Sequence, residues 1–186
     1  MVFILSIDIG IINLGYVFVE IKHNKIKVIE CNRIDITNVK HNRVQFCKCK
    51  LFHGRNIPDY LDHFVQETDA FKKADIILIE RQPPVGITNV QDLLFVKFRD
   101  RVILISPNSL HKHFGMDSDY TIRKTESEAI AKEYLENFNN FIVSERKHDI
   151  SDAMLMIIYY FDKNIKHTME SLKQFTLLFE EFKFKI

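Results

Sequence analysis

The chain has 186 residues, of which 46% are hydrophobic and 27% charged, so it can bury a core and does not have a disordered composition. Its formal net charge of +1 gives no overall indication of a nucleic-acid partner, which only local charge can supply. No apolar run approaches the roughly 20 residues of a membrane span, and the N-terminus lacks the features of a secretory signal. Three cysteines, an odd number, fit a reducing compartment. We therefore expect a soluble intracellular protein that binds no membrane.

Apolar runs and the turn residues between them predict strands first, and then alternating helices and strands. We expect strands at residues 2–9, 16–21, 25–35, 75–80 and 101–107, and helices at 57–73, 125–141, 149–163 and 168–182. The turn "KHNK" joins the second and third strands as a hairpin. This order predicts an α/β fold with a mixed five-stranded sheet, three antiparallel strands plus two parallel ones, flanked by helices.

No linker, repeat or low-complexity tract divides the chain. We therefore expect one domain over residues 1–186, with a core at about 2–163 and a C-terminal helix at about 168–182.

Two carboxylates stand at the ends of apolar strands. Asp8 ends the run "ILSID", and Glu80 ends the run "DIILIE". An acid inside either run would cost several kcal/mol unless it is paired, hydrogen-bonded or metal-bound. Each acid alone is also explained as a partly solvated strand end. The ends of strands are, however, where open α/β sheets bind their ligands.

A second pair of carboxylates opens a helix. The segment "KHDISDAMLMIIYYF" has an apolar stripe at helical spacing, and its other positions are also largely apolar, so we expect this helix to be buried. Asp149 and Asp152 are three residues apart and lie at neighbouring positions of the first turn. Taken alone, such a pair is explained by the helix dipole, which favours each acid by about 0.3–1 kcal/mol.

The four acids Asp8, Glu80, Asp149 and Asp152 together form a candidate metal site. They offer only oxygen ligands, which suit Mg²⁺ or Mn²⁺ rather than Zn²⁺. Two such ions about 3.5–4 Å apart can activate water and stabilise the leaving oxygen in phosphodiester hydrolysis. Because like charges repel, we expect the metal-free site to be unfavourable unless some of the acids stay protonated.

These residues resemble those of RuvC-type Holliday junction resolvases in the RNase H-like superfamily, most closely the poxvirus-type and mitochondrial branches. "SIDIGIINLGY" is similar to the first-strand motif, "IERQPP" to the "ERQ" that ends the fourth strand, and "HDISDA" to the D-x-x-D-A of the last catalytic helix. "SPNSLHKHFG" places Lys112 on one family lysine, and "IRKTE" places Lys124 on a second. The resemblance covers about residues 2–162, and "MDSDYTIR" departs from the family between the two lysines.

The resemblance implies a homodimeric, Mg²⁺-dependent endodeoxyribonuclease that binds four-way DNA junctions. It would make paired symmetric nicks in recombination or replication intermediates, using two Mg²⁺ per active site or Mn²⁺ in their place. The four acids would hold the metal, and Lys112 would join them in catalysis. For a virus that replicates in the cytoplasm, the location would be the host cytoplasm.

Several residues are candidate DNA contacts. They are Asn13, Arg81, Gln82, Lys112, Arg123 and Lys124. Arg81 and Gln82 could equally cap the strand end, and either lysine could be an ordinary surface residue. We expect Gly10 and Gly15 to allow a tight turn and close approach of a DNA strand, with Asn13 positioning that strand or bracing the turn.

The segment 36–58 is basic and contains no Asp or Glu. Its basic residues are Lys40, His41, Arg43, Lys48, Lys50, His53 and Arg55. Such a segment either follows DNA phosphates or is a solvated loop. Cys47 and Cys49 lie in it, but C-x-C is not the usual zinc spacing and no fourth ligand stands out.

Three other functions stay open on the sequence alone. A nuclease for RNA/DNA hybrids or other branched DNA would use the same fold and acids. A non-catalytic nucleic-acid-binding relative is expected to lose at least one acid, whereas all four are present. A sugar-kinase or actin-like ATPase also has D-x-G in its first strand, but needs a second such turn and usually a longer chain.

Overall fold

The structure is a computed structural model of this chain, and it describes residues 1–37 and 56–166. The expected helix at 168–182 and most of the basic segment 36–58 lie outside the described residues. Within the described part, no helix is long and apolar enough to cross a membrane.

Five strands form one mixed sheet in the order β3-β2-β1-β4-β5. They are β1 (Val2–Asp8), β2 (Leu14–Lys22), β3 (Lys25–Ile34), β4 (Ile76–Glu80) and β5 (Val102–Ile105). The first three strands pair antiparallel, whereas β1–β4 and β4–β5 pair parallel. His23 and Asn24 form the hairpin turn between β2 and β3 with positive φ values of 51° and 58°, as a two-residue turn requires. The predicted mixed five-stranded α/β fold is confirmed.

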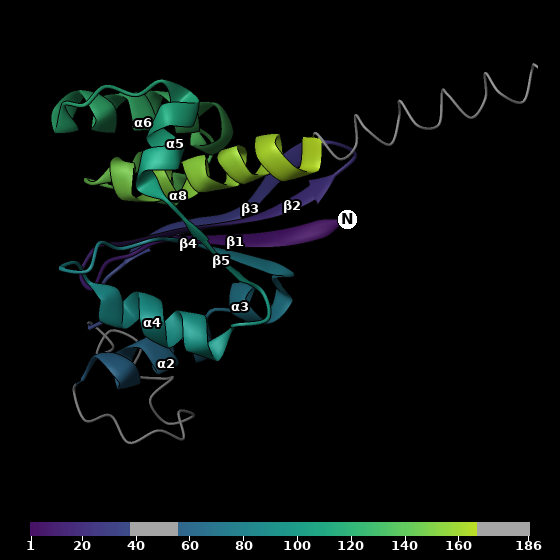
Figure 1. Ribbon diagram of the computed structural model, residues 1–186. Helices are drawn as coiled ribbons and strands as arrows, with labels where there is room; N and C mark the ends of the chain where they lie inside the picture. Colours follow the sequence, from purple (N-terminus) through teal and green to yellow (C-terminus); the bar gives the residue numbers. More distant parts are fainter. Residues whose placement is uncertain (38–55, 167–186) are drawn as a thin grey trace, which may run out of the picture.

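Helices cover both faces of the sheet (Figure 1). They are α2 (Ile57–Glu67), α3 (Ala70–Lys73), α4 (Thr88–Lys97), α5 (Pro107–Phe114), α6 (Tyr120–Leu135), α7 (Asn139–Ile142) and α8 (Lys147–Tyr160), and a π-helical turn, η2 (Phe161–Lys166), follows. Figure 1 shows α5, α6 and α8 on one face and α2, α3 and α4 on the other. Each strand therefore contributes alternate residues to two separate cores.

The helix predictions were right in part. The helix expected at 57–73 is two helices, because Thr68 adopts an extended conformation after α2. Helix α4 was not predicted, since its apolar residues do not share one face: Leu94 is buried and Val96 is exposed. Pro107 does not simply end the fifth strand but begins α5, as its fixed φ permits in a first turn.

The boundaries of the last helices also differ from the prediction. The helix expected at 125–141 begins earlier, at residue 120, because Asp119 caps it by accepting hydrogen bonds from the N–H groups of Thr121 and Ile122. It ends at Leu135, and α7 follows as a separate turn. The helix expected at 149–163 spans 147–160 and is buried along most of its length, as predicted.

Two glycines shape the chain after β1. A Cβ on Gly10 would lie 2.3 Å from the Asn13 carbonyl oxygen, so a tight turn requires glycine there, as expected. A Cβ on Gly15 would lie 2.1 Å from the carbonyl oxygen of Asp149, in the first turn of α8. The space beside Gly15 is therefore filled by α8, and the expectation that this glycine admits a DNA strand is wrong.

Gly15→Ala should separate α8 from β2 and destabilise the fold. Because the added Cβ meets backbone rather than a movable side chain, we expect the free energy of unfolding to fall by about 1–3 kcal/mol. Thermal unfolding measures the loss. Gly86→Ala is the control, since its Cβ would lie 3.0 Å from the Pro83 ring and should cost less. Equal losses of unfolding free energy in the two variants would contradict the explanation that the backbone of α8 fills the space beside Gly15.

Candidate active site at the carboxyl edge of the sheet

Asp8 and Glu80 meet at the carboxyl edge of the sheet. Ile7 of β1 pairs with Ile79 of the parallel strand β4. The next residue of each strand is an acid, so the two acids lie side by side at the ends of neighbouring strands. Ile7 and Ile79 both pack in the core on the α2–α4 face. Because side chains alternate along a strand, Asp8 and Glu80 point to the opposite face, which α6 and α8 cover.

The first turns of α8 bring the other two acids to the same edge. A cavity of about 240 Å³ has Asp8, Glu80 and Asp152 in its wall. A second cavity of about 360 Å³ is lined by Asp8 and Asp149. Asp8 thus stands between the two cavities, and the structure brings the four predicted acids together from three distant parts of the chain.

Both carboxylate oxygens of Asp152 have partners in α6. The hydroxyl of Ser127, which is only 1% exposed, donates a hydrogen bond to Oδ1. The ammonium of Lys124 forms an ion pair with Oδ2. Ser127 and Lys124 are three residues apart in α6 and therefore lie on one face of that helix. This face fixes the orientation of the Asp152 carboxylate.

Asp149 has its own basic partner. Nε of Arg146 donates to Oδ2 at 2.9 Å, and Nη2 donates to Oδ1 at 3.4 Å. Asp149 is buried, whereas the side chain of Arg146 is 43% exposed and lines the second cavity. Each acid of α8 is therefore neutralised by one cationic side chain of the same chain.

The two strand-end acids resist ionisation. Burial raises the pKa of Asp8 well above its usual value, and the carboxylates of Asp152 and Glu80 raise it further. Burial and Asp152 also raise the pKa of Glu80, although a hydrogen bond from Gln82 opposes them. Burial acts to lower the pKa of Lys124, but the attraction of Asp152 outweighs it, so the net shift is upward. These two acids are therefore harder to ionise than ordinary carboxyl groups, chiefly because they are buried.

The chemistry of these side chains fits hard divalent cations. All four predicted ligands are oxygen donors, which Mg²⁺ and Mn²⁺ prefer. Two of them already bind the cationic groups of Lys124 and Arg146. In residues 1–37 and 56–166, no three His, Cys, Asp or Glu side chains stand close enough to form a finished metal cage. A divalent ion held by Asp149 or Asp152 would therefore compete with the basic side chain already bound there.

The two residues after Glu80 have different positions. Nε2 of Gln82 donates to Glu80 at 2.9 Å, and its backbone N–H donates to Gln91 at 2.7 Å. Arg81 is exposed, and its backbone N–H donates to the carbonyl oxygen of Ile105 in β5. Gln82 thus orients an acid of the site, while the Arg81 backbone extends the strand pairing.

The two predicted lysines are not equivalent. Lys124 and Arg123 line the first cavity, whereas Lys112 is exposed on α5 and lines neither cavity. Arg123 lies over the ring of Tyr120 at 5.7 Å, and Lys124 lies over the same ring at 5.4 Å. The structure places Lys124 beside the acids, and a catalytic role for Lys112 stays a prediction.

Sequence reasoning missed Ser127, Arg146 and Arg33. The first two had a signal, because Ser127 follows Lys124, and Asp149 follows Arg146, by three residues, which is one helical turn. Arg33 had none. Its Nη1 donates to Oδ1 of Asn13 at 2.8 Å, and this contact braces the turn before β2, one of the two roles expected for Asn13.

The structural comparisons identify the fold. The resolvase of fowlpox virus, solved with Holliday junction DNA, is similar over 86% of this chain and 97% of that chain, with a TM-score of 0.62 and 18% identity. The yeast mitochondrial resolvase Ydc2 is similar over 92% of this chain and 85% of that chain, with a TM-score of 0.64 and 18% identity. RuvC of T. thermophilus is similar over 88% of this chain and 97% of that chain, with a TM-score of 0.56 and 13% identity. The chain therefore has the RNase H-like fold of the RuvC-type resolvases.

The family follows from the sequence comparison. The family model described as poxvirus A22 protein matches residues 2–164, which is most of the chain. This chain belongs to the poxvirus A22 protein family. Curated protein sequences gave no match.

The raised pKa of Asp8 makes stability depend on pH. A folded-state pKa above the unfolded value of about 3.9 means that Asp8 loses its proton less readily in the folded chain, so ionisation opposes folding as pH rises. With chelator present, Asp8→Asn should therefore raise the Tm near neutral pH, and the gain should disappear as pH falls to about 4. The exposed Asp100→Asn should show no such gain, and a gain independent of pH would contradict the explanation.

Proposed function

We propose that this chain is a divalent-metal-dependent endonuclease that resolves four-way DNA junctions by paired symmetric nicks. The strongest support is the convergence of the four acids on one edge of the sheet, in a member of the poxvirus A22 protein family. The fold of the fowlpox and yeast mitochondrial resolvases adds to it. The work of such an enzyme is to separate recombination or replication intermediates.

The four acids would hold two Mg²⁺ ions, for which Mn²⁺ would substitute. When bound, these ions supply an activated water and stabilise the leaving oxygen of the phosphodiester. Asp8 lines both cavities and is therefore suited to serve both metal positions. Ser127 holds Oδ1 of Asp152 and Lys124 holds Oδ2, so Asp152 would reach a metal ion with its carboxylate already oriented.

Lys124 would have a second role if Asp152 held a metal ion. Its ammonium belongs to the wall of the cavity that holds the acids, where it would stabilise charge developing on the phosphate. Lys112, exposed on α5, is proposed as a second catalytic cation and a DNA contact that the bound strand would approach. The other proposed DNA contacts are Asn13, Arg81, Gln82 and Arg123.

Two symmetric nicks require two active sites, so we assign the active form as a homodimer. Two of the four acids end strands of one sheet, and the other two lie in the helix α8 on a face of that sheet, in keeping with a single nuclease domain over residues 1–186. The site of action would be the host cytoplasm, if the virus replicates there.

End-labelled synthetic four-way junctions with Mg²⁺ test this function. The unmodified chain should nick two opposing strands at symmetric positions. Asp8→Asn and Asp152→Asn should each lower the cleavage rate by at least about 10²-fold, because each removes an anionic ligand of the proposed metal ions, while junction binding persists. The control is again Asp100→Asn, which should cleave normally.

Three results would count against this function. They are equal cleavage of linear duplex or of an RNA/DNA hybrid, activity that survives Asp8→Asn, and a single chain per junction at micromolar concentration. The first result would favour another nuclease of the same fold.

Ser127→Ala should weaken metal binding without removing a ligand. Loss of the hydroxyl frees Asp152 to rotate, and removing such an orienting group typically lowers metal affinity by about 10–100-fold. Calorimetric titration with Mn²⁺, without DNA, measures the effect. Ser151→Ala is the matched control, because Ser151 is also buried but donates to the Lys147 carbonyl within α8. Equal Mn²⁺ affinities in the two variants would refute a positioning role for Ser127.

A further inference from the structure

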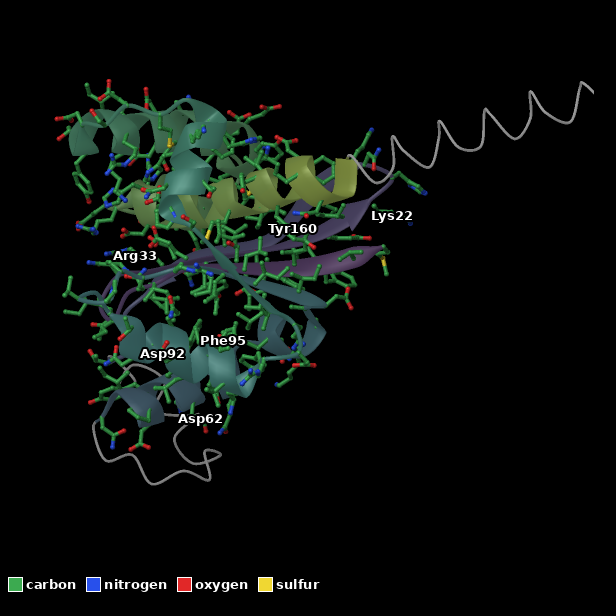
Figure 2. The ribbon with its side chains drawn as sticks, in the orientation of Figure 1. Lys22, Arg33, Asp62, Asp92, Phe95 and Tyr160 are labelled. Carbon is green, nitrogen blue, oxygen red and sulfur yellow. The ribbon has the colours of Figure 1, made fainter. Side chains whose placement is uncertain are left out.

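Arg33 lies in the same row of the sheet as Asp8. Asp8 pairs with Gly15 across β1 and β2, and Gly15 pairs with Arg33 across β2 and β3. Two strand spacings therefore separate Asp8 from Arg33, or about 10 Å. Directly paired residues point to the same face of a sheet, so Arg33 is directed to the face that carries the four acids. Figure 2 shows Arg33 at the end of the sheet, between the two helical layers.

Among the residues that the structure describes, the guanidinium of Arg33 has a neutral hydrogen-bond partner and no counter-ion. It is half-buried, and its Nη1 donates to the neutral amide oxygen of Asn13 at 2.8 Å. Within the described ranges, the basic partners of the four acids are Lys124, Arg146 and His148. No described carboxylate forms an ion pair with Arg33. This arrangement differs from that of Lys124 and Arg146, whose charges are already neutralised.

Asn13 connects Arg33 to the second cavity. The wall of that cavity includes Asn13 together with Asp8 and Asp149. The amide oxygen of Asn13 accepts the hydrogen bond from Arg33, so the guanidinium is held beside a side chain of the cavity wall. A cation held next to a cavity that contains two of the acids is suited to an anionic ligand that extends past them.

We infer that Arg33, positioned by Asn13, binds a phosphate of the cleaved DNA strand that neighbours the scissile phosphate. This inference rests on the proposed nuclease function and adds a contact on the Gly10–Asn13 side of the site. The phosphate contacts proposed above from Arg123 and Lys124 lie in the first cavity. Arg33 would hold the same strand on the far side of Asp8, so that the strand crosses the acids between two cationic groups.

The remaining N–H groups of Arg33 make this contact stronger than a simple point charge would. A guanidinium has five donors in a planar fork, and the hydrogen bond to Asn13 uses only Nη1. The fork matches two oxygens of one phosphate, which an ammonium cannot do with the same geometry. Arg33→Lys should therefore restore only part of the binding that Arg33→Gln loses.

Binding to a four-way junction, measured in EDTA so that no cleavage occurs, tests the contact. Arg33→Gln should weaken binding by about tenfold and reduce the slope of log affinity against log salt by about 1, as loss of one phosphate contact does. Asn13→Ala should produce a smaller loss, since it releases Arg33 without removing its charge. Arg99→Gln is the matched control, because Arg99 is exposed beside Phe95 in the α4 layer, and should bind as the unmodified chain does.

Junctions with single methylphosphonate groups locate the contact. Replacing the phosphate that Arg33 binds should weaken junction binding by the unmodified chain but not by Arg33→Gln. At every other position, the replacement should affect both chains alike. The inference is overturned if Arg33→Gln loses no more affinity than Arg99→Gln, or if it stays as sensitive as the unmodified chain at every position.

The behaviour of the unmodified chain distinguishes a failure of this inference from a failure of the proposed function. If it binds junctions but does not nick them, the function fails and the Arg33 comparison still decides the contact. If it nicks them and Arg33→Gln binds normally, only the contact fails. If it binds no DNA, both fail.

Discussion

Like-charged carboxylates confined to one edge of a sheet are the constraint on which this site depends. Asp8 and Glu80 cannot move apart, because parallel pairing fixes Ile7 beside Ile79 directly before them. Burial is the main reason that the pKa values of both acids are raised, and the nearby carboxylate of Asp152 raises them further. Lys124 offsets the negative charge of Asp152 through an ion pair, and Arg146 does the same at Asp149. In the metal-free chain, two of its own cations thus bind carboxylates at which divalent ions are proposed to bind.

The helical layer on the same face sets how the acids are presented. Because Gly15 has no side chain, the first turn of α8 can lie against β2, and this contact brings Asp149 next to Asp8. The neighbouring helix α6 then provides Ser127 and Lys124 from one face to fix Asp152. A rigid scaffold of this kind keeps carboxylates near the geometry that metal-assisted hydrolysis requires.

The sequence was most informative where a local rule was strict. Alternation and apolar runs located all five strands within about two residues, and the D-x-x-D spacing placed Asp149 and Asp152 on one helix. The prediction failed where the local signal was weak. Helix α4 lacks an amphipathic pattern, and α5 was not recognised because its first residue, Pro107, also resembles the end of a strand. The roles of Ser127 and Arg33 depend on partners 25 and 20 residues away, which no local rule connects.

The sequence by itself determined the four acids, their order and their positions at strand ends and a helix start, because period-2 and period-3.6 patterns are local properties. Only the tertiary structure decided which cation serves which acid. It placed Lys124 in the cavity and Lys112 outside it, although both follow the fifth strand in the sequence. It also placed Arg33 in register with Asp8 through Gly15. The reason is physical: charge compensation depends on distances through space, and strand pairing and helix packing set those distances.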